Sequence, residues 1–169
     1  PVMIGQIQVV GCEDPEASRD AILAAKEELI ESCNDVDPIL VKFGGGCRDV
    51  EARIIETDSG PMIIVHILVD CRDAMGANAV NTMAETIAPR IESVSGGTVI
   101  LRIISNLAVH RLARVSATFT AEEMSDVGTD AERGAEVIDG VLQAYHFAAA
   151  DPFRATTHNK GIMNAISAI

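Results

Sequence analysis

An almost unbroken run of apolar residues at positions 62–69 constrains the fold more than any other feature of this sequence. Such a run is typical of a strand in the middle of a sheet that is covered by other parts of the protein. The preceding segment, residues 50–55, largely alternates apolar and charged side chains, as a half-exposed strand does. Residues 57–61 between them have the composition of a turn. We therefore expect a hairpin of two strands.

One helix is predicted before this hairpin and one after it. Asp14 followed by Pro15 is a typical helix start, and the first helix is expected to end within residues 34–38. A second helix is expected to open at Asp73, and Pro89 should kink it.

Two further apolar segments, residues 5–12 and 99–105, predict strands, the second of them interrupted by Arg102. The order is then strand, helix, hairpin, helix, strand. This order predicts an α+β fold of the ferredoxin-like β-α-β-β-α-β type, with a four-stranded antiparallel sheet and two helices on one face.

The character of the sequence changes after about residue 107. Residues 111–119 alternate and predict an additional strand, whereas residues 137–149 carry apolar side chains at helical spacing. We therefore place a domain boundary near Leu107, which gives one domain over residues 1–107 and part of another, mainly helical, over residues 108–169.

The composition argues against two classes of partner. The chain of 169 residues has a formal net charge of −12 at pH 7, which disfavours binding to the phosphate backbone of nucleic acids. No window contains the roughly 20 consecutive apolar residues that a membrane-spanning helix needs. The start of the chain lacks the basic and apolar regions of a secretory signal, so we expect a cytoplasmic protein without a membrane partner.

Four cysteines lie far apart, and neither they nor the histidines have the spacing of a zinc site, so no metal is expected. We expect reduced and mostly buried thiols. The alternative is a nucleophilic cysteine, for which Cys47, directly after three glycines, is the best candidate.

Asp73 and Asn78 flank Gly76 at the point where a strand is expected to pass into a helix. A helix N-terminus offers unpaired N–H groups and a partial positive charge, and a glycine lets a ligand approach the backbone. This combination suits a flat, charged ligand. Taken alone, however, the same residues favour a simpler alternative in which Asp73 caps the helix.

Three other sites carry possible chemistry. Lys160 lies in a polar segment close to His158, where a lysine could stabilise an oxyanion and a histidine could carry a proton. A solvated surface lysine is the more usual alternative. Residues 44–46 are three glycines that could cradle phosphate, and Asp37 could bond ribose hydroxyls and repel a 2′-phosphate. The alternative for the three glycines is a flexible connector, and the alternative for Asp37 is a turn residue before Pro38.

Taken together, these segments resemble the 3-hydroxy-3-methylglutaryl-coenzyme A reductase family in its class II, bacterial and archaeal, form. The resemblance extends over essentially the whole chain, in one order. Four segments carry it: DAMGANAVNTMAE at 73–85, ISNLA at 104–108 with Ile103 before it, ATTHNKGIMN at 155–164 and GGGCRD at 44–49.

The resemblance implies a role for each matching residue. The residues at the nicotinamide dinucleotide site would be Asp73, Met75, Gly76, Asn78 and Asn106. Asp37 falls where class II enzymes that prefer NADH carry an aspartate against the adenosine ribose. Lys160 matches the catalytic lysine, and the positions near the substrate acyl group and the lysine are matched by Arg154, Thr157 and Asn164.

The family reduces the thioester of hydroxymethylglutaryl-CoA to mevalonate and CoA in two hydride transfers, through a thiohemiacetal and an aldehyde. A lysine suits this chemistry because each hydride addition places negative charge on an oxygen atom. The resemblance implies NAD as the cofactor, with NADP as an alternative. It also implies a homodimer or larger homo-oligomer whose substrate site forms between subunits.

In that family, residues 1–107 would be the small cofactor-binding domain and residues 108–169 part of the large substrate domain. Two positions depart from the family pattern: Ala165 replaces a glycine and Val109 replaces an acidic residue. The family's catalytic glutamate, aspartate and histidine have no counterpart here, so we expect a piece of a longer enzyme that is inactive alone. The alternative is a non-catalytic dinucleotide-binding or ferredoxin-like interaction module.

Overall fold

The structure is a computed structural model that describes residues 1–125 and 130–169. Its packing divides the chain into two compact units, Pro1–Ala113 and Arg114–Ile169. The first unit ends a few residues beyond Leu107, where the sequence predicts a boundary. The assignment of the two units to a cofactor domain and a substrate domain stays a prediction.

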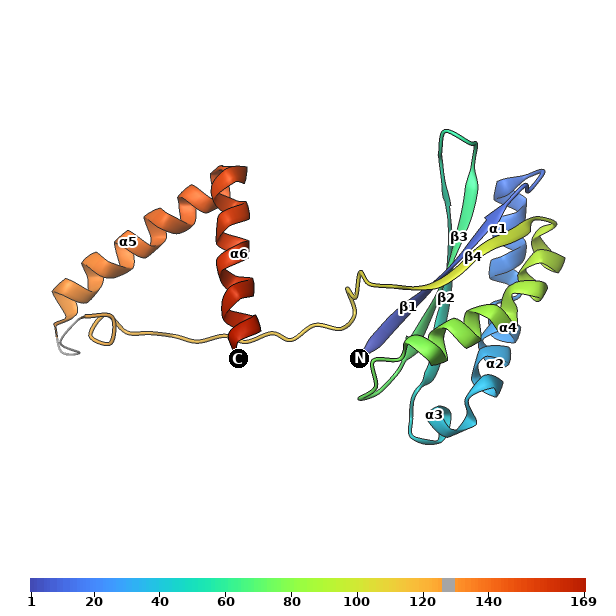
Figure 1. Cartoon of the computed structure of the whole chain (residues 1–169), viewed down its shortest axis with the longest axis horizontal. Helices are drawn as coiled ribbons and strands as arrows, with labels where there is room; N and C mark the ends of the chain where they lie inside the picture. The colour runs from blue at the N-terminus through green and yellow to red at the C-terminus, as the bar shows by residue number, and fades with distance from the viewer. Residues whose placement is uncertain (126–129) are drawn as a thin grey trace. The chain divides into compact units, whose positions relative to one another are not determined.

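The first unit is a four-stranded antiparallel sheet with helices (Figure 1). Its elements are β1 (Val2–Val10), α1 (Pro15–Ala24), α2 (Lys26–Val36), α3 (Pro38–Lys42), β2 (Gly46–Ile55), β3 (Met62–Asp70), α4 (Ala77–Ser95) and β4 (Thr98–Ser105). The strand order β2-β3-β1-β4 is that of the ferredoxin-like arrangement, which confirms the predicted fold class.

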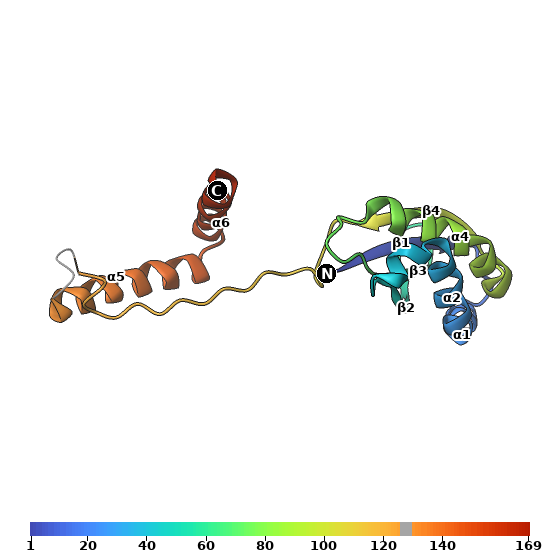
Figure 2. The same cartoon turned by 90° about the horizontal axis from the view of Figure 1, so that it is seen from below.

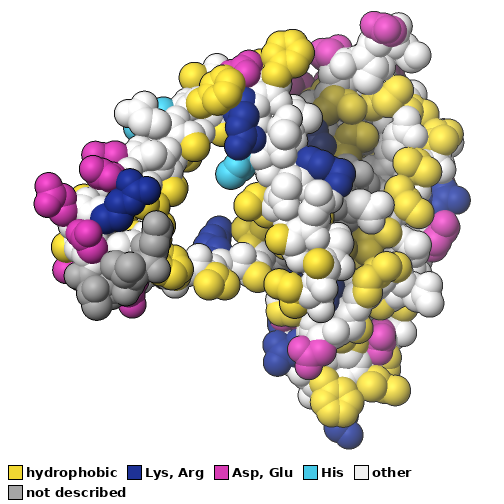
Figure 3. Space-filling model, turned by 60° about the vertical axis from the view of Figure 1, so that its left-hand side comes forward, with side chains coloured by type: hydrophobic (Ala, Val, Ile, Leu, Met, Phe, Trp, Pro, Cys, Tyr) yellow, Lys and Arg dark blue, Asp and Glu magenta, His cyan; other side chains and the backbone are white. Residues whose placement is uncertain are grey.

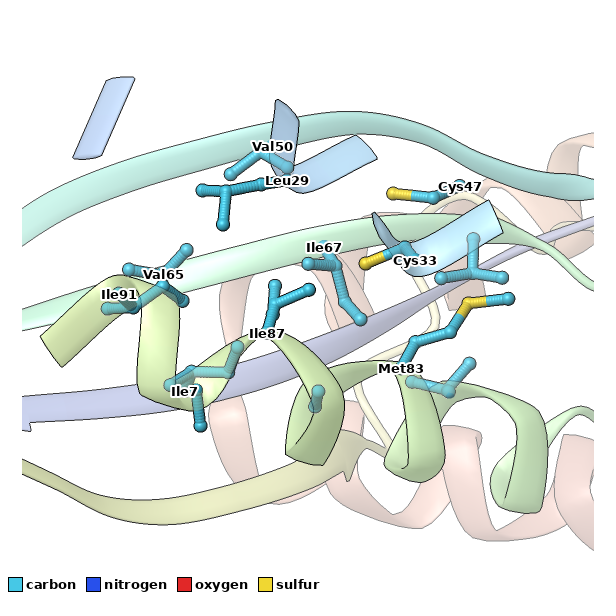
Figure 4. Close-up of a cluster of buried hydrophobic side chains, with 14 of the residues drawn as sticks. Ile7, Leu29, Cys33, Cys47, Val50, Val65, Ile67, Met83, Ile87 and Ile91 are labelled. Carbon is cyan, nitrogen blue, oxygen red and sulfur yellow. The ribbon is translucent and has the colours of Figure 1, made fainter. Parts of the chain in front are cut away.

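The core lies between one face of the sheet and the helices (Figure 4). Alternate residues of β3, from Ile63 to Val69, are buried and pack with Met83 and Ile87 of α4. The intervening residues of β3 are only partly buried. Residues 62–69 therefore form a central strand, as predicted, but the helices cover only one face of it. Some hydrophobic side chains of the molecule reach its surface, as Figure 3 shows.

The second of the predicted helices, which corresponds to α4, begins later than predicted. Residues 71–74 form a turn in which the Ala74 N–H donates to the Cys71 carbonyl at 3.1 Å. Gly76 then takes a left-handed conformation, with φ +91°, and α4 starts at Ala77. Asp73 therefore lies in the turn and does not cap the helix. The helix then continues through Pro89 as one element to Ser95.

The region before β2 also differs from the prediction. Instead of one helix, α1 and α2 meet at Ala25, and a short third helix, α3, follows. Asp37 caps α3, because its Oδ1 accepts from the Leu40 N–H at 2.8 Å. Arg102 does not interrupt β4: it pairs with Ile7 of β1 in the sheet, and its side chain forms an ion pair with Glu85 of α4 at 2.6 Å.

The second unit contains α5 (Ala131–Ala150) and α6 (Pro152–Ala168). The helix predicted over residues 137–149 is confirmed by α5. The strand predicted over residues 111–119 is wrong, since this segment is drawn as a trace without a strand in Figures 1 and 2. Its alternating side chains bury nothing, as the 95% exposure of Val115 illustrates, and a strand needs a neighbouring strand to bond to.

The polar segment around Lys160 is helical. Asp151 caps α6 through its carboxylate, which accepts from the N–H groups of Phe153 and Arg154. The hydroxyls of Thr156 and Thr157 donate to carbonyls four residues back, at 2.8 and 3.1 Å. These bonds satisfy the polar side chains within the helix itself, so a threonine-rich stretch remains helical.

Candidate functional site

A cavity of about 470 Å³ opens beside α3 and the turn over residues 71–74, and we call it the α3 cavity. Two sequence-predicted site residues, Asp37 and Asp73, line it although they are far apart in the chain. The complete lining is Asp37, Ile39, Leu40, Phe43, Cys71, Arg72, Asp73 and Ala74. Two of the carboxylates that the sequence analysis singled out therefore line the same cavity.

Asp37 both caps a helix and lines the α3 cavity. It is the N-cap of α3, through the bond from the Leu40 N–H, whereas the simpler alternative was a turn residue before Pro38. Its partly buried side chain also lines the cavity. Only one carboxylate oxygen accepts in the cap, so capping and ligand binding are compatible.

Gly76 cannot be replaced without strain. A Cβ atom at this position would lie 2.2 Å from Sγ of Cys71, which is 1% exposed, and the φ of +91° disfavours any L side chain. The glycine thus brings the backbone of residues 73–78 against the core. Its neighbours remain accessible, since Met75 is 66% exposed and Asn78 lies exposed on the first turn of α4.

No side chain caps the start of α4. The first N–H groups of a helix that lacks a side-chain cap can bind an acceptor from a ligand, and the helix dipole favours a negative one. Gly76 and Asn78 sit at this end of α4. The local geometry that the sequence analysis attributed to residues 73–78 is therefore present, except that Gly76, not Asp73, precedes the helix.

The segment after β4 supplies a contact that sequence reasoning missed. Nη1 of Arg111 donates to the carbonyls of Ala74 and Met75, at 2.9 and 3.2 Å. Asn106, exposed just after β4, accepts from the Ala108 N–H through its carbonyl at 3.0 Å. No local pattern in the sequence signals the role of Arg111, because its partners are main-chain atoms distant in the chain.

We expect Arg111→Met to weaken binding of a ligand held by residues 73–78 by about three- to tenfold, because it removes two hydrogen bonds to their backbone and keeps the apolar stem. The melting temperature should change little. Titration of NADH measures the effect, with Arg114→Met as a control of equal charge. Equal affinities in both variants would contradict a positioning role for Arg111.

The second group of predicted residues lies on α6. Nζ of Lys160 donates to Oδ1 of Asn164, and both side chains are exposed. Arg154, Thr157, Lys160 and Asn164 follow one another at intervals of three or four residues, so they lie on one side of the helix. The structure thus groups the predicted catalytic lysine with the three positions predicted near it, all within the second unit.

The cysteines are free, and three of the four are buried. Cys47 contacts Cys33 in the core (Figure 4), and the hydrogen bond that they share lowers the pKa of Cys47 and raises that of Cys33. Cys47 is only 4% exposed, so a substrate has no access to its thiol. This burial argues against the nucleophile alternative and agrees with the expected buried thiols.

The residues that the structure describes, 1–125 and 130–169, contain no group of three or more His, Cys, Asp or Glu side chains placed to bind a metal ion. Within the same residues, no helix has both the length and the apolar character needed to cross a membrane.

Comparison with known proteins gives one family. The family model for hydroxymethylglutaryl-coenzyme A reductase matches residues 1–169. A 3-hydroxy-3-methylglutaryl-coenzyme A reductase from Archaeoglobus fulgidus is 56% identical over 168 residues, which are 99% of this chain and 37% of that protein. A probable enzyme of the same name from Borreliella burgdorferi is 31% identical over 137 residues, covering 79% of this chain and 31% of its own length.

Solved structures agree with the sequence comparison. A 3-hydroxy-3-methylglutaryl-coenzyme A reductase from Streptococcus pneumoniae matches with a TM-score of 0.88 at 35% identity, over 98% of this chain and 38% of that one. A class II enzyme from the same organism, bound to NADPH in open conformations, matches with a TM-score of 0.85. This chain spans well under half the length of these relatives. The family model nevertheless covers it from end to end, and the chain belongs to the hydroxymethylglutaryl-coenzyme A reductase family.

Proposed function

We propose that this chain is the cofactor-binding part, with an adjoining helical part, of an enzyme that interconverts hydroxymethylglutaryl-CoA with mevalonate and CoA. The observation that carries the proposal is the α3 cavity, which Asp37 and Asp73 both line in a chain of this family. A relative of class II is described as bound to NADPH, which supports a nicotinamide cofactor here.

The residues present fit a dinucleotide. Gly76 lets the backbone turn closely against the buried side chain of Cys71, and the uncapped start of α4 offers N–H donors. Carboxylates such as Asp37 and Asp73 accept hydrogen bonds from ribose hydroxyls. Residues proposed to hold the cofactor are Asp37, Asp73, Met75, Gly76, Asn78 and Asn106. When bound, the nicotinamide supplies or accepts the hydride.

Lys160 is proposed to stabilise the substrate oxygen on which negative charge develops. Its ammonium group has three N–H donors, and Asn164 accepts one of them, so the others remain to meet that oxygen. Asn164 also restrains the long lysine side chain, which reduces the entropy lost when the lysine binds substrate. Arg154 and Thr157 on the same side of α6 are proposed to contact the acyl group.

We further propose a homodimer or larger homo-oligomer for the full-length enzyme and a location in the cytoplasm, which the four free cysteines support. The α6 residues belong to a unit that exposes many apolar side chains, among them Phe153 at 84% and Ile166 at 60%. Such exposure supports burial of these side chains against other parts of the assembly.

The test compares this 169-residue chain with a full-length enzyme that carries it. We expect the chain to bind NADH and the full-length enzyme to oxidise mevalonate in a CoA-dependent reaction. Binding without turnover in the full-length enzyme would favour the alternative, a non-catalytic dinucleotide-binding module. An inability of both proteins to bind either nicotinamide cofactor would contradict the proposal.

Asp37 leads us to propose NADH as the preferred cofactor, because its carboxylate would repel the 2′-phosphate of NADPH. We expect Asp37→Asn to improve binding of NADPH relative to NADH by about tenfold, since asparagine caps a helix as well as aspartate but carries no charge. Titration of both cofactors measures the ratio.

Asp35→Asn is the matched control for this experiment. Asp35 is exposed on α2, does not line the α3 cavity, and its replacement gives the same change in net charge. Tighter binding of NADPH than NADH by the unmodified chain, or an equal shift in both variants, would show that Asp37 does not select the cofactor.

A further inference from the structure

The strand β4 lies at an edge of the sheet, because it pairs with β1 alone (Figure 1). The N–H groups on its outer side have no neighbouring strand to bond to, so they need other acceptors. Two N–H groups of β4 donate to side chains of α4 instead. The Ile104 N–H donates to Oδ1 of Asn81 at 2.8 Å. The Val99 N–H donates to Oε1 of Glu92, also at 2.8 Å.

The two acceptors lie on one side of α4. Asn81 and Glu92 are separated by about three full helical turns, so they face the same direction. Both side chains are partly buried. Between them Glu85 forms an ion pair with Arg102 of β4. One row of side chains on α4 therefore holds β4 near both of its ends.

Only the bond to Asn81 lies close in the chain to residues proposed to hold the cofactor. Asn106 follows Ile104 by two residues, and Asn81 lies in the second turn of α4, just after its uncapped start. The bond to Glu92 lies at the other end of the helix, close to Ser95. The two bonds are thus alike in length and in burial of the acceptor, and they differ in their position relative to the proposed site.

A second attachment holds the chain on the far side of Asn106. Nη1 of Arg111 donates to the carbonyls of Ala74 and Met75, just before the start of α4. Asn106 therefore stands between two attachments, one through the Ile104 N–H and one through Arg111. Together they fix the backbone on both sides of Asn106 relative to the start of α4.

We propose that Asn81 is a positioning residue for the cofactor site: it fixes the end of β4 through the Ile104 N–H and thereby places Asn106 against the start of α4. This inference rests on the proposed function, in which Asn106 and the first residues of α4 hold the dinucleotide. The amide oxygen of Asn81 already accepts a hydrogen bond from the backbone. Asn81 acts through that backbone and not by contact with the cofactor.

The test measures NADH binding and turnover in a full-length enzyme that carries this sequence. Asn81→Leu keeps the size of the side chain and removes the acceptor. It is expected to weaken NADH binding by about tenfold, because a strand end that is free to shift holds Asn106 in the binding position for only part of the time. At saturating NADH, kcat should stay within about threefold of the original. Asn81→Asp keeps an acceptor of the same length and should restore most of the affinity.

Glu92→Met is the matched control, because it removes the equivalent acceptor at the end of α4 that is remote from the site. Both variants should lower the melting temperature, since each leaves an N–H group of β4 without its acceptor. Only Asn81→Leu should lose NADH affinity. Asn81→Ala, whose small side chain admits water to the Ile104 N–H, is the second variant if Asn81→Leu does not fold, and it should weaken NADH binding by about threefold or more.

Equal NADH affinities in the Asn81 variants and in Glu92→Met would overturn this inference and leave Asn81 as a residue that only completes the sheet edge. A failure of Asn81→Asp to restore any affinity would overturn it as well. In both cases the unmodified enzyme still binds NADH and the proposed function stands. If the unmodified enzyme binds neither nicotinamide cofactor, the proposed function is overturned, and this inference with it.

Discussion

Lys160→Ala is expected to lower the turnover of a full-length enzyme that carries this sequence by about 10²- to 10³-fold or more, with NADH affinity within about twofold of the original. Loss of a fixed positive charge beside a developing oxyanion has an effect of this size. Lys160 is exposed and donates a hydrogen bond to Asn164, which is also exposed, so the substitution leaves no buried group unsatisfied. Steady-state rates and cofactor titration measure the two quantities.

Lys42→Ala is the matched control, because Lys42 is an exposed lysine in the last turn of α3 and has no proposed catalytic role. It should retain turnover. Asn164→Ala should give an intermediate loss, since it frees the lysine side chain without removing its charge. Normal turnover in Lys160→Ala would show that this lysine is a solvated surface residue, as the simpler interpretation of the sequence holds.

Gly76→Ala is expected to lower NADH affinity by more than tenfold and the free energy of unfolding by about 3 kcal/mol. The left-handed φ accounts for about 1 kcal/mol of this loss. The rest comes from overlap of the new Cβ atom with the buried side chain of Cys71, because a packed core relaxes little. Urea denaturation and NADH titration measure the two effects.

Gly60→Ala separates the two causes. Gly60 has φ +99°, but nothing lies within 4 Å of a Cβ atom placed there. Its replacement should therefore cost only the conformational term, about 1 kcal/mol, and leave NADH affinity unchanged. Equal losses of stability in the two variants would mean that Cys71 gives way easily and that close packing beneath Gly76 is unimportant.

The ferredoxin-like order could be predicted because hydrophobic periodicity is a local property of the sequence. Helix starts are also local, because an aspartate N-cap followed by proline marks them in the sequence. Asp14–Pro15, Asp37–Pro38 and Asp151–Pro152 each begin a helix, with aspartate as the N-cap and proline at the first helical position. The same signature that predicted α1 also marks the starts of α3 and α6, for which no separate helix was predicted.

The strand predicted over residues 111–119 failed for a different reason. Alternation describes which side chains could share a face, but a strand also needs a hydrogen-bonding neighbour elsewhere in the chain. The same limit applies to the site. Asp37 and Asp73 were singled out by composition and resemblance, but their common cavity, and the presence of Arg72 within it, depend on contacts between distant segments.

The anchoring of residues 73–78 by Arg111 bears on where this domain can be cut. These residues lie in the turn after β3 and at the start of α4, which ends at Ser95, and the sheet is complete at Ser105. A protein shortened to Ser105 would keep every strand and helix of the first unit, yet the carbonyls of Ala74 and Met75 would lose their donor. The smallest piece that holds this loop in place therefore extends at least to Arg111.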